Sequence, residues 1–340
     1  MTKPIVISDP YPRTLELIFT KKKFKELKSN YTILNSPKTN KKRFYENNIH
    51  KATFILGQPD LDKALLLKAK KLKAIINVES NFLDNMDYNY CFEKGIHVIA
   101  TSPVFSKPVA ELALGLTLSL LRDIHNSQQS FLNKKEKYGL EGNLKASLLS
   151  QKKIGLLGYG DIAKALTPLL LPFSNDINIY DPWVPNKIII ENGFKNISLE
   201  NMFKTCDVIY VLAAITKNNF YLIDKKLLNK LKPQSLFILM SRAAVVNFKH
   251  LINRVKKGDI YVATDVFPDE PVKKNDPIRK VKNILFSAHR AGALKSVFEE
   301  MGNIVMEDMK LISKNLPPRL CKRAERETVG LLRSKPVAIN

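Results

Sequence analysis

Three polar side chains in the second half of the chain suit acid–base chemistry on an anionic substrate. Arg242, Glu270 and His289 each come shortly after a run of apolar residues. The imidazole pKa suits proton transfer near neutral pH, and a nearby carboxylate favours the protonated ring. A guanidinium group can bind a carboxylate through two parallel hydrogen bonds. Taken singly, the three residues could equally be a surface charge, a turn residue and an ordinary histidine.

A glycine-rich segment earlier in the chain predicts a dinucleotide cofactor. In IGLLGYGDIAKA (154–165), Gly158, Gly160 and Ala163 occupy the G-x-G-x-x-A positions that follow a strand and open a helix. Such a turn brings backbone N–H groups up to a pyrophosphate. Asp181 ends the next apolar run, 181 − 163 = 18 residues on, near the spacing of roughly 20 expected of a ribose-binding acid. The acid favours NAD over NADP, and the alternative is an ordinary turn with a surface aspartate.

The two observations together predict hydride transfer to a carbonyl group. Such a reaction needs a proton donor for the developing alkoxide and a cation that binds and polarises the substrate. Ligands of parallel sheets bind beyond the carboxyl ends of the strands. Because Arg242, Glu270 and His289 follow successive predicted strands, we expect them at one such edge.

The elements that must position these residues alternate between short apolar strands and helical stretches. The predicted strands before the fingerprint are 5–7, 31–34, 52–56, 74–78 and 97–100, and those after it are 208–212, 236–240, 260–264 and 284–287. This alternation predicts parallel sheets. The helix expected over 109–121 is apolar on most faces, so we expect it to be buried between layers.

Several longer segments resemble the D-isomer-specific 2-hydroxyacid dehydrogenase family, from about residue 72 to about residue 292. Besides the fingerprint, they are LDNMDYNYCFEKGIHV (83–98), VAELALGL (109–116), CDVIYVLAAIT (206–216), LLNKLKPQSLFILMSRAAVVN (227–247), DVFPDEPV (265–272) and SAHRAG (287–292). The resemblance implies an α/β protein of two Rossmann-like or flavodoxin-like parallel-sheet domains. The NAD-binding domain (104–291) would be inserted into the substrate domain (1–103 plus 292–340).

The resemblance also implies a role for each site residue. His289 would be the general acid/base, Glu270 its carboxylate partner, and Arg242 the residue that binds the substrate carboxylate and polarises its carbonyl. Asp265 would hold the nicotinamide carboxamide and Asp181 the adenosine ribose. The predicted cofactor-binding residues are Gly158, Gly160, Asp161, Ile162, Ala163, Asp181, Ser241 and Asp265, and the predicted substrate-binding residues are Ser80, Asn81, Phe82 and Arg242.

The chain departs from the family pattern at several loops. Where members usually have a glycine-rich loop for the substrate carboxylate, this chain has NVESNF (77–82). Leu212 and Ala214 replace a frequent His and Pro, Ala243 replaces the Gly after the catalytic Arg, and Asp161 replaces a usual basic residue. None of these departures removes a predicted catalytic group.

The charge balance bears on possible partners. There are 55 Lys and Arg against 32 Asp and Glu, a net charge of +23, but the basic residues are mostly Lys spread through helical stretches. An Arg-rich stripe with interleaved aromatics is absent from the sequence, so we do not expect nucleic acid as a partner. We expect neither a membrane partner nor a metal site. The three separated cysteines suit a reducing, cytoplasmic setting, and the family resemblance implies a homodimer.

These features predict an NAD-dependent D-2-hydroxyacid dehydrogenase, or 2-ketoacid reductase. Its substrate would be a small anionic acid related to hydroxypyruvate, glycerate or phosphoglycerate. The alternative from another class is a non-catalytic, NAD-responsive binding protein of the corepressor type on the same fold. A binding protein has no need of Arg242, Glu270 and His289 together. Formate oxidation is disfavoured, since that branch pairs its histidine with glutamine.

Overall fold

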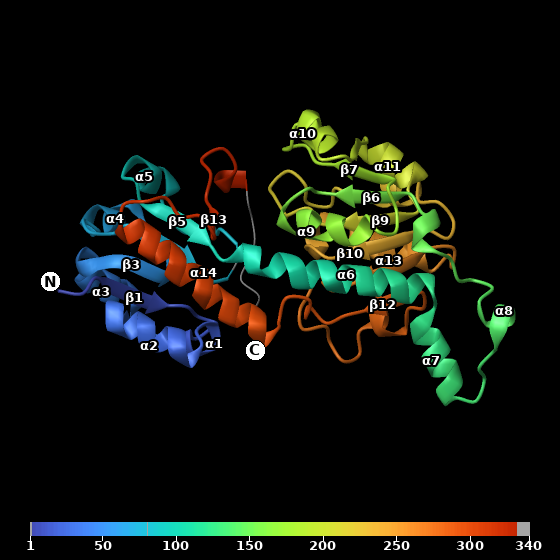
Figure 1. The fold of residues 1–340 in the computed structure, drawn as a ribbon, viewed down its shortest axis with the longest axis horizontal. Helices are drawn as coiled ribbons and strands as arrows, with labels where there is room; N and C mark the ends of the chain where they lie inside the picture. Colours follow the sequence, from blue (N-terminus) through green and yellow to red (C-terminus); the bar gives the residue numbers. More distant parts are fainter. Residues whose placement is uncertain (1, 80, 332–340) are drawn as a thin grey trace. The chain divides into compact units, whose positions relative to one another are not determined.

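The computed structural model describes residues 2–79 and 81–331, and it divides into two compact units. Unit 1 comprises the chain up to Phe105 together with the part from Ala293 on, and unit 2 is Ser106–Gly292. The boundaries expected from the sequence, at 103/104 and 291/292, lie beside these. Each unit has its own sheet and its own core, as Figure 1 shows.

Unit 1 is built on a six-stranded sheet in the order β13-β5-β4-β3-β1-β2. All neighbours pair in parallel except β13, which runs antiparallel to β5. Its elements are β1 (Ile5–Asp9), α1 (Leu15–Ile18), α2 (Lys21–Asn30), β2 (Thr32–Asn35), α3 (Lys41–Asn48), β3 (Ala52–Gly57), α4 (Lys63–Lys68), β4 (Ala74–Asn77), α5 (Tyr88–Glu93), β5 (His97–Ala100), α14 (Lys295–Ser313) and β13 (Lys322–Arg323).

Helices cover both faces of this sheet because alternate strand residues are apolar on each side. Side chains of α1, α2 and α14 pack with Val6, Phe54 and Ile76 on one face. Those of α3, α4 and α5 pack with Ile55 and Ile75 on the other. Figure 1 shows α14 lying across unit 1. The strand order reverses between β1 and β3, and such sheets bind ligands at this switch point.

Unit 2 is built on a seven-stranded, all-parallel sheet in the order β12-β11-β10-β9-β6-β7-β8. The strand order reverses between β6 and β9. Its elements are α6 (Ser106–Leu121), α7 (Ile124–Leu132), α8 (Gly139–Gly142), β6 (Ile154–Leu157), α9 (Asp161–Leu170), β7 (Ile177–Tyr180), α10 (Asn186–Glu191), β8 (Lys195–Asn196), α11 (Leu199–Thr205), β9 (Val208–Val211), α12 (Lys225–Leu228), β10 (Leu236–Leu239), α13 (Phe248–Val255), β11 (Tyr261–Thr264) and β12 (Ile284–Phe286).

These two sheets confirm the predicted fold class of two parallel-sheet α/β bodies. The predicted helix over 109–121 is the core part of α6, which packs on α9, β10 and β11. Among the described residues, one helical run, Ser102–Leu121, is long and apolar enough to cross a membrane. Core helices pass the same test, and the α6 part of this run buries Ala110, Ala113 and Thr117 within the protein.

Candidate active site

The glycine turn after β6 lies at the switch point of the unit 2 sheet. Gly158 has a φ of +99°, and a Cβ added to it would come 2.8 Å from the backbone N and Cα of Ala213, which lies just beyond β9. A side chain there would be both strained and crowded. A Cβ on Gly160 would meet nothing within 4 Å. The turn therefore packs against the protein at Gly158 and faces open space at Gly160. The open space at Gly160 fits the close approach of a pyrophosphate.

Helix α9 begins directly after this turn, so the N–H groups of its first turn point back toward it. Asp161 and Ile162 are its first two residues and are half-buried. Ala163 is completely buried, as expected of a small residue that lets the helix pack closely on its strand. The predicted cofactor-binding residues of the fingerprint thus occupy a strand, turn and helix start of the required geometry.

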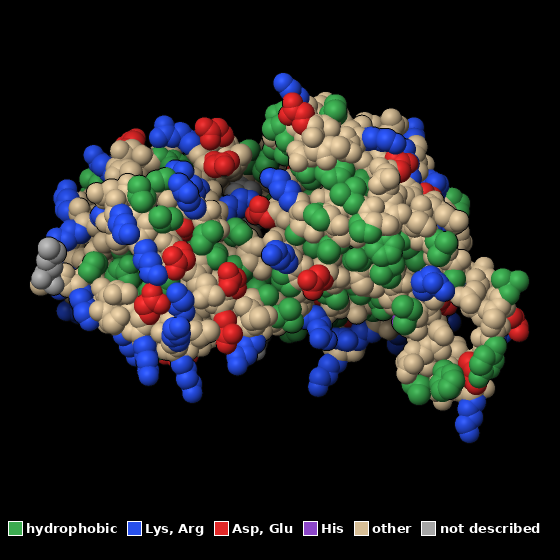
Figure 2. Space-filling model, in the orientation of Figure 1, with side chains coloured by type: hydrophobic (Ala, Val, Ile, Leu, Met, Phe, Trp, Pro, Cys, Tyr) green, Lys and Arg blue, Asp and Glu red, His purple; other side chains and the backbone are tan. Residues whose placement is uncertain are grey.

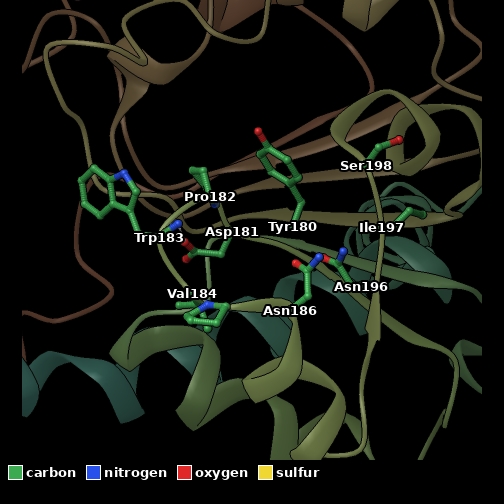
Figure 3. A pocket seen from close by; sticks show the side chains of 10 residues that line it. Tyr180, Asp181, Pro182, Trp183, Val184, Asn186, Asn196, Ile197 and Ser198 are labelled. Atoms are coloured by element: carbon green, nitrogen blue, oxygen red, sulfur yellow. Dashed lines mark hydrogen bonds between the residues drawn. The ribbon is translucent and has the colours of Figure 1, made fainter.

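Asp181 follows β7 and is held by two backbone N–H groups. Tyr159 N–H donates to Oδ2 (2.7 Å) and Trp183 N–H donates to Oδ1 (2.8 Å). The carboxylate therefore joins the glycine turn to the end of β7. Asp181 and Trp183 also line a hollow of about 520 Å³ with residues from the turn after β7 and from β8 onward, as Figure 3 shows. This hollow is large enough for a nucleoside.

Arg242 lies beyond β10 and is half-buried. Its Nη1 donates to the carbonyl of Ser241 (2.9 Å). Burial lowers the pKa of Arg242, and the charge of Glu270 opposes that shift. An arginine stays protonated under these conditions. Within the described residues, the buried Ser241 hydroxyl has no hydrogen-bond partner.

Glu270 and His289 form a pair in unit 2. His289 Nδ1 and Glu270 Oε2 share a hydrogen bond of 2.5 Å, and the Phe267 N–H donates to Glu270 Oε1 (2.8 Å). Burial alone raises the pKa of Glu270, but the bonds from His289 and Phe267, with the charges of His289 and Arg242, leave the pKa below its ordinary value. Glu270 is therefore an ionised partner that fixes the imidazole through Nδ1 and leaves Nε2 for another molecule.

Asp265, which follows β11, holds the loop that carries His289. The His289 N–H donates to the Asp265 carbonyl (2.7 Å), while the Arg290 and Ala291 N–H groups donate to its carboxylate (3.0 and 3.1 Å). His289 has a φ of +47°, in the left-handed region that a histidine rarely adopts. The nearly buried carboxylate therefore stabilises an unusual backbone. This loop-holding contact was not predicted, and its cofactor role stays a prediction.

The structure brings Arg242, Asp265 and His289 to one edge of unit 2, because β10, β11 and β12 are neighbours in the sheet. The predicted substrate-binding residues belong to unit 1. Ser80 lies outside the described residues. The Asn81 carbonyl accepts a hydrogen bond from Asn77 Nδ2, and the Phe82 side chain is buried in the unit 1 core, which leaves only its backbone for a ligand.

Sequence reasoning did not predict the charged pair of Arg13 and Glu79 in unit 1. Arg13 Nε lies 3.0 Å from Glu79 Oε1, although the two residues are far apart in sequence. No motif flags Arg13. The only available signal was the acid at position 79, in a loop where the resembling family usually has glycine.

The model of the D-isomer specific 2-hydroxyacid dehydrogenase NAD binding domain matches residues 114–291. A glyoxylate reductase from Thermococcus litoralis is 30% identical over 77% of this chain and 81% of its own length. A hydroxypyruvate reductase from Thermotoga maritima is 29% identical over 73% of this chain and 84% of its own. The crystal structure of a phosphoglycerate oxidoreductase from Rhizobium etli superposes with a TM-score of 0.87 at 42% identity, over 96% of this chain and all of that one.

Proposed function

Because the chain belongs to the D-isomer specific 2-hydroxyacid dehydrogenase family, it is an NAD-dependent oxidoreductase that acts on CH–OH groups, and we propose which residues carry out the reaction. The substrate is a small 2-keto or D-2-hydroxy acid related to hydroxypyruvate, glycerate or phosphoglycerate. The hydrogen-bonded pair of His289 and Glu270 is the observation that supports this proposal most.

In the reducing direction, bound NADH supplies the hydride for the 2-keto carbon. His289 donates a proton from Nε2 to the carbonyl oxygen as negative charge develops there. Glu270 holds the ring through Nδ1, which leaves Nε2 for the substrate oxygen. Arg242 binds the substrate carboxylate and polarises the carbonyl. In the oxidising direction the same imidazole accepts the proton.

The cofactor is held by residues of unit 2. Gly158, Gly160 and the start of α9 would hold the pyrophosphate, and Asp181 would accept from the adenosine ribose hydroxyls. Each Asp181 oxygen accepts one backbone bond, and a carboxylate oxygen can accept a second. Ser241 and Asp265 would hold the nicotinamide end, and the partnerless Ser241 hydroxyl supports that role.

The experiment is NADH oxidation with a panel of 2-keto acids. The enzyme reduces at least one of them, whereas a corepressor-type binding protein binds NADH and turns nothing over. His289→Ala and Arg242→Ala nearly abolish turnover and leave NADH binding intact. Trp183 reports that binding, because it is the one tryptophan in the chain and it lines the hollow beside Asp181. Near-normal kcat in either variant would contradict the assignment.

We also propose a homodimer, with the segment 124–148 of unit 2 at the contact. Figure 2 shows hydrophobic side chains on this segment. Phe131, Tyr138, Leu140 and Leu144 are each more than 60% exposed, which is a costly surface for a lone protomer. Sedimentation should give a dimer, and Leu140→Asp with Leu144→Asp should give a monomer.

We also propose that the enzyme is cytoplasmic and does not bind nucleic acid. On the face in Figure 2, lysine and arginine side chains are scattered with acidic side chains between them. Cys91, Cys206 and Cys321 are free and buried, as in a reducing compartment. Retention on DNA should vanish at physiological salt.

A further inference from the structure

The turn that carries His289 is held by the segment after β11 at two separate points. The ring is held by Glu270 through Nδ1. The backbone is held by Asp265, whose carbonyl accepts from the His289 N–H and whose carboxylate accepts from the N–H groups of Arg290 and Ala291. Both partners belong to one segment of unit 2, so these contacts of His289 lie within that unit.

The carboxylate of Asp265 lies in a concave turn of backbone N–H groups. His289 has a φ of +47°, and the next two N–H groups after it point to the same carboxylate. Successive N–H groups in such a turn form a site for an anion. Asp265 is only 2% exposed, so its side chain, rather than solvent, satisfies these groups. The negative charge of Asp265 therefore stabilises a backbone conformation that a histidine rarely adopts.

Asp265 itself is fixed by the strands on both sides of β11. Its N–H donates to the Leu239 carbonyl at the end of β10 (3.2 Å). The preceding residue, Thr264, is completely buried, and its carbonyl accepts from the N–H of Ser287, which follows β12 (2.9 Å). Asp265 is therefore a fixed point of the sheet edge against which the His289 turn is held.

We propose that Asp265 is a positioning residue for proton transfer, because its carboxylate holds the left-handed turn that presents the His289 imidazole to the substrate. Proton transfer needs the donor within hydrogen-bond reach of the substrate oxygen. A shift of the turn therefore lowers the rate even though every reacting group is still present. This role is distinct from a contact with nicotinamide, which would act on the affinity for the cofactor. The inference rests on the proposed role of His289 as the acid.

The test compares wild type with Asp265→Asn, using the 2-keto acid that the wild type reduces fastest. The amide keeps the shape of the carboxylate, but it loses the charge and turns an NH2 group toward a backbone N–H. We expect kcat to fall by about 100-fold, the cost of displacing a reacting group by roughly 1 Å. The KM for the 2-keto acid, and the Kd for NADH from Trp183 fluorescence, should stay within a few-fold of wild type, because Arg242 and the glycine turn are unchanged.

A second variant, Arg290→Pro, opens the same turn and leaves Asp265 in place. Proline has no N–H for the Asp265 carboxylate, and it drives the residue before it, His289, toward an extended backbone. We expect a loss of kcat as large as in Asp265→Asn, with the affinity for NADH unchanged. Arg290→Ala removes the same exposed side chain but keeps the N–H, so it should lose far less.

Asp308→Asn in α14 of unit 1 controls for a loss of stability alone. Asp308 is a completely buried carboxylate that also accepts from backbone N–H groups, those of Arg319, Leu320 and Cys321. This variant should lower the melting temperature, as Asp265→Asn does, but keep kcat within a few-fold of wild type.

The outcomes separate this inference from the proposed function. The positioning role is overturned if Asp265→Asn keeps the wild-type kcat, if its loss of rate disappears at saturating NADH, or if Asp308→Asn loses kcat as strongly. If Asp265→Asn does not fold, Arg290→Pro decides, and a wild-type kcat in that variant overturns the role. The reductase assignment stands in all these cases. If the wild type binds NADH but reduces no 2-keto acid, the proposed function fails and this inference fails with it.

Discussion

The carboxyl edges of the two sheets each hold a glutamate beside a cationic or proton-binding side chain, and the two glutamates are in opposite states. In unit 2, Glu270 receives hydrogen bonds on both oxygens, from Phe267 and His289, and its pKa is lowered. In unit 1, Glu79 faces Arg13 without a hydrogen bond, and its pKa is raised. Both are partly buried. The two carboxylates therefore differ mainly in hydrogen bonding rather than in the nearby charge. Glu270 has a donor for each oxygen, whereas Glu79 can still accept hydrogen bonds.

The largest expected difference is in turnover. Glu270→Gln should lower kcat by about 100-fold for every substrate, because the charged partner that holds the imidazole through Nδ1 is lost. Glu79→Gln should leave kcat for pyruvate within a few-fold of wild type. Steady-state kinetics of both variants, made with the same isosteric change, provide the measurement. Equal losses of kcat in the two variants would show that the two glutamates do not differ in their contribution to turnover.

A second contrast concerns the glycines at the two edges. A Cβ on Gly57, which ends β3 in unit 1, would overlap the carbonyl oxygen of Asp9, and its φ is +137°. Gly57→Ala and Gly158→Ala should each lower the free energy of unfolding by at least about 1–3 kcal/mol, because backbone strain and steric overlap both destabilise the fold. Gly160→Ala meets open space and should cost less than about 1 kcal/mol while weakening NADH binding.

Thermal unfolding of the three alanine variants measures these costs, and Trp183 fluorescence measures the affinity for NADH. A Gly160→Ala variant that unfolds as readily as Gly158→Ala would mean that the turn is closed at both positions. Unchanged affinity in a folded Gly160→Ala variant would argue against a pyrophosphate there.

The smallest expected effect concerns the free energy of unfolding, to which the two glutamates should contribute with opposite dependence on pH. The lowered pKa of Glu270 contributes stability that is present above its ordinary value of 4.5 and is lost as the pH falls through the lowered value. The raised pKa of Glu79 means that its ionised form costs stability at neutral pH. That cost disappears as the pH falls through the raised value toward 4.5.

Urea unfolding between about pH 7 and pH 3 tests this contrast. The wild type should be more stable to unfolding than Glu270→Gln at neutral pH, and this difference should shrink on acidification. Relative to Glu79→Gln, the wild type should gain stability over the same range. Parallel pH profiles for the two comparisons would contradict the opposite pKa shifts.

Much of the fold could be predicted because apolar runs and glycine turns are local signals. The strands at His97–Ala100 and Ile284–Phe286 match the predicted runs to within one residue, and the strand-end residues followed from them. The two-residue strands β8 and β13 carry no such signal. The segment between β1 and β2 holds two helices, α1 and α2, since Thr20 caps the second through its hydroxyl.

Contacts between distant segments could not be predicted. The pairing of Arg13 with Glu79 depends on the sheet order, which brings β1 and β4 to either side of β3. The two bonds from the His289 loop to the Asp265 carboxylate depend on backbone geometry rather than on residue type. The roles of the site residues came from resemblance, whereas the orientations that support those roles came from the structure.

The insertion of unit 2 has a consequence for the newly made protein. As the chain leaves the ribosome, unit 2 is complete once Gly292 has emerged, while unit 1 still lacks α14 and β13. Until α14 arrives, the sheet face that contains Val6, Phe54 and Ile76 lacks the cover that Met301, Val305 and Met309 later provide. The part of unit 1 that precedes unit 2 is therefore synthesised before unit 2, but it can complete its core only after unit 2 has been synthesised.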